Sequence, residues 1–173
     1  MILTGSKIIK EINNGNLVIT PFKTDRVSTN SYDLALGKEY LLYTDEIIDP
    51  RKKSNYELKN IPDLGLKLNP GDFILASSEE VIGSEKYVPL IHAKSGIARS
   101  GLFVHITADL IDIGSIGTVT FQLYATLPIT IYSGMLLGQV TFWNVDGEIN
   151  LYNGKYQKSN GPQPSKTHLD YIN

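Results

Sequence analysis

The residues around position 95 combine positive charge, a hydroxyl group and small side chains. The run contains Lys94, Ser95, Gly96 and Arg99. Cationic side chains and free backbone N–H groups both stabilise phosphate oxygens, so this pattern predicts a segment that binds a polyphosphate. On these residue types alone, the end of a helix that carries surface charges is the commoner explanation.

A carboxylate follows a short distance along the chain. Asp112 lies between Ile111 and Ile113, directly before Gly114. A carboxylate at the end of a strand, next to a glycine turn, can face a cleft. A single Asp in such a place more often caps a turn, so the residue types leave both roles open.

The elements that must position these side chains are mostly short strands. Apolar runs cut by turn residues occur at 17–19, 40–43, 64–68, 73–76, 103–106, 119–124, 129–131 and 137–143. Asn69–Asp72 and Tyr132–Gly134 are the clearest turns. Many short strands separated by turns predict an all-β fold, a distorted jelly roll or β-barrel.

One short helix is expected before the strands. Ile8, Ile9 and Ile12 fall on one helical face, Thr4 precedes them as a cap, and Asn14 with the following glycine ends the helix.

Two segments lack the material for a core. The charged stretch 50–55 predicts a surface loop. The residues after Tyr152 carry few apolar side chains, so 152–173 is expected to be a disordered tail or an arm ordered by a ligand or a neighbouring subunit.

Length and composition narrow the class. With 173 residues, 42% of them hydrophobic, residues 1–173 are expected to form a single domain. The absence of cysteine excludes a Cys-ligated zinc, and the net charge of −2 argues against nucleic acid as a partner. No apolar run is long enough for a membrane span, so a cytoplasmic protein without a membrane partner is expected.

Five segments in the order of the chain resemble the trimeric dUTPase and dCTP deaminase family. Lys94–Ala98 is similar to the Arg-Ser-Gly-Leu-Ala motif of trimeric dUTPases, and His105–Asp112 to the matching dCTP deaminase segment. Residues 31–37, 134–139 and the tail from Gly154 to Ser165 resemble further family motifs. Within the family, the chain is most similar to archaeal-type dUTPases built on a deaminase-like scaffold.

The resemblance implies a homotrimer with active sites at subunit boundaries and a pyrimidine deoxynucleoside triphosphate as ligand. It also implies Mg²⁺ bound mainly through the triphosphate, with no separate protein metal site. Asp112 would meet the sugar 3′-hydroxyl and the attacking water. The implied substrate-binding residues are Lys94, Ser95, Gly96 and Arg99 around the phosphates, Thr107 and Ala108 at the pyrimidine, and Gln139, Tyr152, Lys155 and Tyr156 closing over the ligand.

The departure that decides between the two family activities is Gln122. Deaminases of the family carry Glu at the matching place, where it moves protons between water and the pyrimidine ring. A neutral amide cannot accept and return a proton, and losing such a group typically costs about 10²–10⁴-fold in rate. Gly96, where deaminases usually have Ser, points the same way, so Gln122 predicts a dUTPase.

Two further departures concern ligand contacts. Ser115 stands where the family places an aromatic residue under the deoxyribose, and Ser159 stands where many deaminases have a Gln. Of the remaining polar residues, Asp33 is expected to cap a turn or to lie near the metal, and His105 to be a core or interface residue of an apolar strand.

Three functions from different classes follow, in order of preference. The first is a Mg²⁺-dependent dUTP diphosphatase that releases dUMP and pyrophosphate. The second is a dCTP deaminase, either unusual or with an introduced Glu-to-Gln change. The third is a relative that binds nucleotide without turnover.

Overall fold

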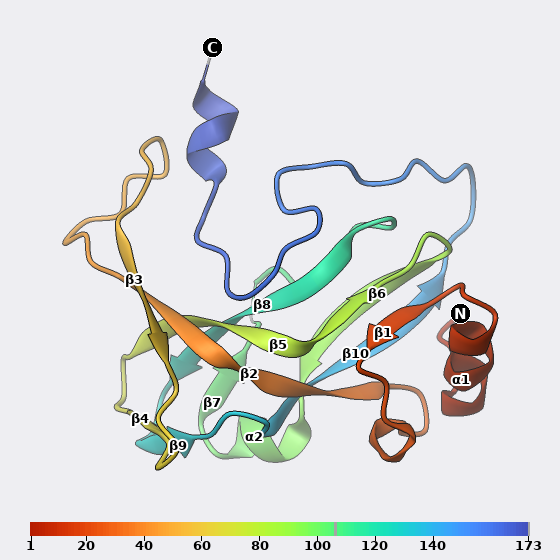
Figure 1. The fold of residues 1–173 in the computed structure, drawn as a ribbon, viewed down its shortest axis with the longest axis horizontal. Helices are drawn as coiled ribbons and strands as arrows, with labels where there is room; N and C mark the ends of the chain where they lie inside the picture. Colours follow the sequence, from red (N-terminus) through yellow and green to blue (C-terminus); the bar gives the residue numbers. More distant parts are fainter. Residues whose placement is uncertain (106, 173) are drawn as a thin grey trace.

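The computed structural model describes residues 1–105 and 107–172, and most of its elements are strands (Figure 1). The helices are α1 (Gly5–Asn13) and α2 (Ser95–Arg99), with two 3₁₀ turns, η1 (Thr24–Arg26) and η2 (Thr167–Tyr171). The strands are β1 (Val18–Thr20), β2 (Tyr32–Tyr43), β3 (Tyr56–Asn60), β4 (Leu66–Leu68), β5 (Phe73–Gly83), β6 (Tyr87–Ala93), β7 (Leu102–Val104), β8 (Ile116–Ala125), β9 (Ile129–Ile131) and β10 (Leu136–Asn144).

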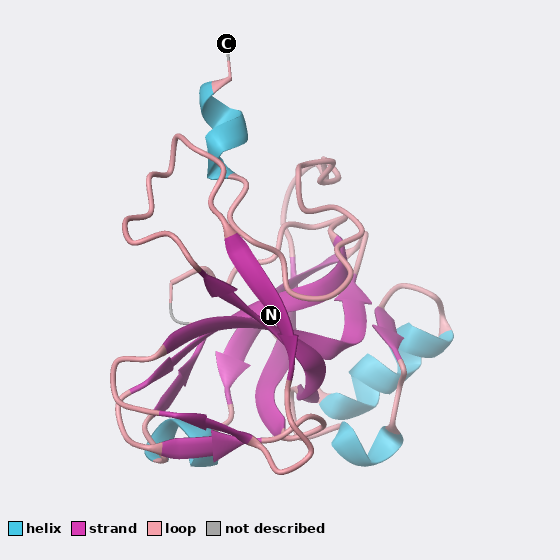
Figure 2. Cartoon of the chain, turned by 60° about the vertical axis from the view of Figure 1, so that its left-hand side comes forward, coloured by secondary structure: helices cyan, strands magenta, loops and turns pink. Residues whose placement is uncertain are grey.

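Eight of these strands form one curved sheet in the order β6-β10-β2-β5-β8-β7, with β1 added to β5 and β3 to β2. All pairings are antiparallel, and β4 pairs with β9 in a separate two-stranded sheet. Figure 2 shows the sheets curving around a common interior, with the short helices at the periphery. This arrangement confirms the predicted all-β, barrel-like fold with its N-terminal helix. The fold prediction did not include α2, which follows β6 directly.

The two faces of β8 have different roles. Val119, Phe121 and Leu123 point into the core and are almost fully buried. Because successive side chains of a strand point to opposite faces, Thr120 and Gln122 lie on the outer face. That outer face carries the cavity described below.

β5 is irregular where it crosses the middle of the sheet. Its pairing with β8 shifts register between Ser77 and Val81. Side chains replace the missing ladder bonds: Ser78 Oγ accepts from Val119 N at 2.9 Å and donates to Glu80 O at 2.6 Å, while Glu80 Oε2 accepts from Ala35 N at 3.1 Å. The bulge therefore places a carboxylate with no solvent exposure between β2 and β5.

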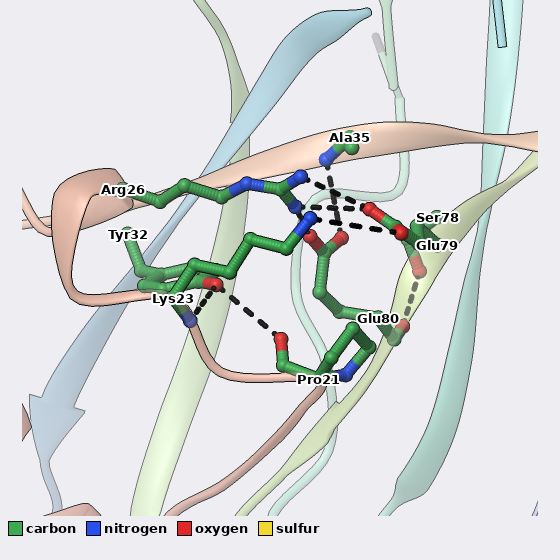
Figure 3. Close-up of polar contacts among 8 residues, drawn as sticks. All are labelled: Pro21, Lys23, Arg26, Tyr32, Ala35, Ser78, Glu79 and Glu80. Atoms are coloured by element: carbon green, nitrogen blue, oxygen red, sulfur yellow. Dashed lines mark hydrogen bonds and ion pairs between the residues drawn. The ribbon is translucent and has the colours of Figure 1, made fainter. Parts of the chain in front are cut away.

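Arg26 supplies the counter-charge to this carboxylate (Figure 3). Its guanidinium, 10% exposed, forms ion pairs with Glu80 and, at 3.1 Å, with Glu79. Burial raises the pKa of Glu80, and the Ala35 N–H and the Arg26 charge act against that shift. The ion pair thereby ties η1 to β5.

Replacing Arg26 should destabilise the fold. Arg26→Ala leaves the Glu80 carboxylate buried without its counter-charge, so we expect a loss of about 3–5 kcal/mol in the free energy of unfolding, measured by urea denaturation. Arg51→Ala is the matched control, because Arg51 is exposed and pairs only with Asp49 at 3.7 Å; it should cost less than about 0.5 kcal/mol. Equal losses in the two variants would show that the Arg26–Glu80 pair does not support the sheet.

Candidate active site

A cavity of about 610 Å³ lies on the outer face of β5 and β8. Its walls come from β5 and β8, from Tyr43 at the end of β2, from the loop after β7, from the turn before β8, and from the C-terminal arm, defined here as residues 152–172. The wall residues discussed below are Leu75, Gly117, Thr118, Thr120 and Gln122 from the strands, His105, Thr107 and Ala108 from the loop, Asp112 and Ser115 from the turn, and Tyr152, Tyr156, Ser159, Gln163 and Ser165 from the arm.

Six of the predicted site residues meet at this cavity. Asp112 and Gln122, the two predicted catalytic residues, both line it, and so do four predicted substrate contacts: Thr107, Ala108, Tyr152 and Tyr156. Residues that are up to 49 positions apart in the chain, from Thr107 to Tyr156, therefore contribute to one concave surface.

The other six predicted substrate contacts are not among the cavity walls; they are Lys94, Ser95, Gly96, Arg99, Gln139 and Lys155. Figure 1 places α2 at the end of the molecule opposite to the arm. Within one chain, the predicted phosphate-binding segment thus lies apart from the cavity that holds Asp112 and Gln122.

Lys94 belongs to a second polar cluster on β2 and β10. Its ammonium group pairs with the Asp33 carboxylate. Asp33 faces Gln139 on the neighbouring strand, and Ser31 Oγ donates to Gln139 Oε1 at 3.3 Å. The proposed turn-capping role of Asp33 is wrong, because Asp33 lies within β2.

Lys155 also has a partner outside the cavity. Its ammonium group forms an ion pair with Asp170 of η2 and lies 6.0 Å from the centre of the Tyr156 ring. This pairing raises the pKa of Lys155, first through the hydrogen bond to Asp170.

Asp112 lies on a turn fixed by backbone hydrogen bonds. Ser115 N donates to Asp112 O at 3.0 Å, and Gly114, with a φ of +90°, donates to Ser84 O at 2.7 Å. The Asp112 side chain is exposed at the rim, and it is the one charged side chain among the described residues of the cavity wall. Lysine and arginine are absent from the described part of that wall.

Gln122 lies opposite Leu75 on β5, on the outer face of β8. Its side-chain oxygen is buried and has no hydrogen-bond partner among the described residues. A buried amide oxygen without a partner costs free energy, so this position favours an additional donor. The amide stays neutral at every physiological pH and cannot transfer a proton as a carboxyl group does.

His105 has a more direct part in the cavity than the sequence suggested. It follows β7 instead of lying in a strand, and its φ of +57° is uncommon for a non-glycine residue. Its N–H donates to Gln122 O at 3.1 Å, and its buried Nδ1 lacks a partner in the described structure. Burial lowers the pKa of His105 and favours a neutral ring at pH 7. The sequence predicts a core or interface role and does not indicate that His105 lines the cavity. A single His in an apolar run does not change the hydrophobic periodicity, so it gives no sign of such a position.

The arm docks on its own chain, along the first half of β8. Lys158 N donates to Ile116 O at 3.0 Å, and Thr118 N donates to Ser159 O at 2.9 Å. Farther along, Gln163 N donates to Thr120 Oγ1 at 3.0 Å and Ser165 N to Tyr43 OH at 2.8 Å. The alternatives of a disordered tail or one ordered by a ligand or neighbour did not include this docking, which uses backbone groups instead of apolar side chains.

Within residues 1–105 and 107–172, His, Asp and Glu side chains form no group of three or more that could hold a metal ion. The helices of the described chain are all too short or too polar to cross a bilayer.

Comparisons with known proteins agree with this fold. The model of the dCTP deaminase-like family matches residues 2–145. A relative from Clostridium botulinum (strain Eklund 17B / Type B), named "dCTP deaminase, dUMP-forming", is 41% identical over 172 residues, covering 99% of each chain. Relatives with the same name from Clostridium acetobutylicum and Leptospira biflexa are 38% and 37% identical, the former over the whole of both chains and the latter over 99% of this chain and 98% of its own.

A solved structure shares the fold. The dCTP deaminase from Agrobacterium tumefaciens superposes with a TM-score of 0.64 at 20% identity, covering 82% of this chain and 47% of the other. The present chain thus spans about half the length of that protein, and the likeness concerns the fold alone. The shared fold is the curved antiparallel sheet described above. The chain belongs to the dCTP deaminase-like family.

Gly117 provides a test of arm docking. A Cβ at this position would lie 2.4 Å from Ser159 Oγ and 2.7 Å from Ser159 N, so Gly117→Ala should push the arm off β8. We expect trypsin to cleave after Lys155 and Lys158 about tenfold faster than in the unaltered protein, because the open arm becomes more populated. Gly96→Ala is the control, since nothing lies within 4 Å of its added Cβ. Equal cleavage rates in both variants would contradict the docking described here.

Proposed function

We propose that this protein is a dUTP diphosphatase, which converts dUTP and water to dUMP and pyrophosphate and does not deaminate dCTP. The observation that carries the proposal is the amide of Gln122 in the wall of the cavity. By the resemblance described above, Gln122 stands where deaminases of the family carry the Glu that moves protons.

Deamination needs protons to move between water, the ring nitrogen and the leaving amine. Asp112 is exposed at the cavity rim, whereas Gln122 lies on the outer face of β8 beside the His105 backbone. His105 is kept neutral by burial, and its Nδ1 is enclosed in the protein. A loss of general acid–base catalysis at the ring should therefore suppress ammonia release by about 10²–10⁴-fold.

Hydrolysis of the phosphoanhydride does not depend on that group. Water attacks the α-phosphorus, the bond to the pyrophosphate oxygen breaks, and the water proton passes to a base. Asp112 is suited to orient the water and accept this proton, because it is the charged group at the rim and sits on a rigid turn. The relatives are named for forming dUMP, a product that requires loss of two phosphates from dCTP as well as loss of the amine.

Magnesium would be held mainly by the triphosphate, with Asp112 as the nearest carboxylate at the rim. The described residues offer no cluster of ligands that would bind the ion alone. Bound there, Mg²⁺ would neutralise charge on the phosphate oxygens.

The cations that bind the phosphates are proposed to come from a neighbouring copy, in a homotrimer. The cavity wall lacks Lys and Arg among the described residues, whereas α2 carries Arg99 and lies at the other end of the chain. Aromatic side chains beside Gln122 offer a surface for such a neighbour: Phe73, Phe103 and Tyr124 are 46%, 47% and 37% exposed. They lie side by side on β5, β8 and β7, and exposed apolar patches of this kind favour association.

The second candidate is the combined reaction, from dCTP to dUMP. It is favoured by the relatives at 37–41% identity that carry this name. Gln122 is the feature that separates the two candidates.

Separate incubations with dUTP and dCTP test the proposal. With Mg²⁺ present, we expect steady pyrophosphate release from dUTP and at least about 10²-fold slower ammonia release from dCTP. Asp112→Asn should reduce dUTP hydrolysis by about 10²-fold or more, because the amide cannot take the proton. Efficient ammonia release from dCTP by the unaltered protein would overturn the proposal in favour of the second candidate.

Gln122→Glu serves as the complementary variant in this assay. If the scaffold still holds dCTP for deamination, the restored carboxyl group should produce strong ammonia release. If the rest of the cavity is also suited to dUTP hydrolysis and not to deamination, the variant should gain little ammonia release. Neither result changes the expectation for Asp112→Asn.

Mixing two inactive variants tests whether the site is shared between copies. Asp112→Asn damages the cavity and Arg99→Ala damages α2, so each variant alone should be inactive. After unfolding and refolding together in equal amounts, about a quarter of the sites should combine an intact cavity with an intact neighbour's α2 and recover activity. Failure to recover any activity, with particles still larger than the 19.2 kDa chain by light scattering, would exclude the shared site.

A further inference from the structure

The side chain of Gln157 connects the C-terminal arm to the turn that carries Asp112. Its oxygen accepts hydrogen bonds from Ile116 N at 2.9 Å and Lys158 N at 3.2 Å. Its nitrogen donates to Gly114 O at 2.7 Å and Tyr152 O at 3.1 Å. Both donors of the amide and two acceptor sites of its oxygen are thus in use.

These four partners belong to two segments of the chain that border the cavity. Gly114 lies in the turn that carries Asp112 and Ile116 begins β8 directly after it, whereas Tyr152 and Lys158 belong to the arm. Gln157 itself is not among the cavity-wall residues, so it acts from behind them. The Gln157 side chain therefore links the Asp112 turn to the arm tyrosines, in addition to the backbone hydrogen bond between Tyr152 N and Ile113 O.

Only a primary amide satisfies this arrangement. Its oxygen faces two N–H groups and its nitrogen faces two carbonyl groups, so rotating the amide would set like groups against each other. A carboxylate of the same shape would keep the two accepted bonds but would point an anionic oxygen at the carbonyls of Gly114 and Tyr152. Gln157→Glu thus changes the shape of the side chain very little but removes the two hydrogen bonds that its nitrogen donates to Gly114 and Tyr152.

Close packing next to Gln157 shows why the link is sensitive. A Cβ on Gly114 would lie 2.9 Å from both Leu151 Cβ and Tyr152 N, which leaves no slack between the turn and the start of the arm. Tyr152 N also donates to Ile113 O at 2.8 Å. A small change at Gln157 is therefore passed directly to Tyr152.

We propose that Gln157 is a positioning residue, which holds the arm tyrosines over the cavity and thereby governs nucleotide affinity. The turn that bears Asp112 has independent support from Ser84 and from Pro89, whose carbonyl accepts from Ile111 N at 3.0 Å. Loss of the Gln157 link consequently loosens the arm and leaves the Asp112 turn in place. The consequence for turnover rests on the function proposed above; the consequence for the arm does not.

The first measurement is hydrogen–deuterium exchange of peptides that cover residues 152–165, with and without millimolar dUTP or dCTP. Gln157→Glu and Gln157→Ala should speed exchange of the arm amides by about tenfold or more, since at least two hydrogen bonds are lost. Asn160→Asp is the matched control: it adds the same charge at an exposed position of the arm whose side chain does not reach the turn. Its exchange should equal that of the unaltered protein.

The second measurement separates positioning from general loss of structure. With whichever nucleotide is turned over, Gln157→Glu should raise KM by about tenfold and change kcat by less than about threefold, whereas Asn160→Asp should change neither. A fall in kcat with unchanged KM would overturn the proposal, because it would indicate a smaller folded fraction. Equal arm exchange in all four proteins, with and without nucleotide, would also overturn it. If neither nucleotide is hydrolysed or deaminated, the proposed function fails, and the exchange data still decide the role of Gln157.

Discussion

The architecture of the site depends on the unpaired edge of β8. Strand β7 is short and pairs only with Leu123–Ala125, so the backbone groups of Ile116 and Thr118 on that side need other partners. The C-terminal arm supplies them through Lys158 and Ser159. Because the arm must follow this edge, its tyrosines are brought over the outer face of β8, and the cavity exists between them. A segment too polar to enter the core thus becomes part of the site through backbone hydrogen bonding.

The opposite edge of β8, which pairs with β5, is held by hydrogen bonds from side chains. There the bulge of β5 interrupts the ladder, and Ser78 and Glu80 use their side chains to bond Val119 and Ala35. Replacing regular pairing by a buried carboxylate requires a counter-charge, which Arg26 provides from η1. β8 is therefore fixed from one side by the arm and from the other by buried side chains, and Gln122, on its outer face, has a defined position relative to Asp112.

The features that could be predicted are those with a periodic or collinear signal. The apolar runs and turns predicted an all-β fold, and the spacing of Ile8, Ile9 and Ile12 predicted the helix seen at Gly5–Asn13. The motifs, which occur in the family's order along the chain, predicted that Asp112, Gln122 and Tyr152 belong to one site. The structure places these residues around one cavity. Single hydrogen-bonding side chains leave no such signal. The four bonds of Gln157, the wall position of His105 and the pairing of Lys94 with Asp33 depend on register and backbone angles, which emerge only when distant strands pair.

The proposal that the site is shared between copies rests on the separation of charge in the single chain. The described cavity wall offers one carboxylate and no cation to a ligand that would carry several negative charges, so a triphosphate would be repelled from the isolated chain. The exposed guanidinium of Arg99 remains hydrated on α2, where it is available to an approaching copy. Complementary charge at opposite ends of one chain favours head-to-tail contact, and such contacts close into rings when the rotation allows it. Assembly would then create the phosphate site and bury the aromatic face beside Gln122 in the same step, which couples nucleotide binding to the subunit interface.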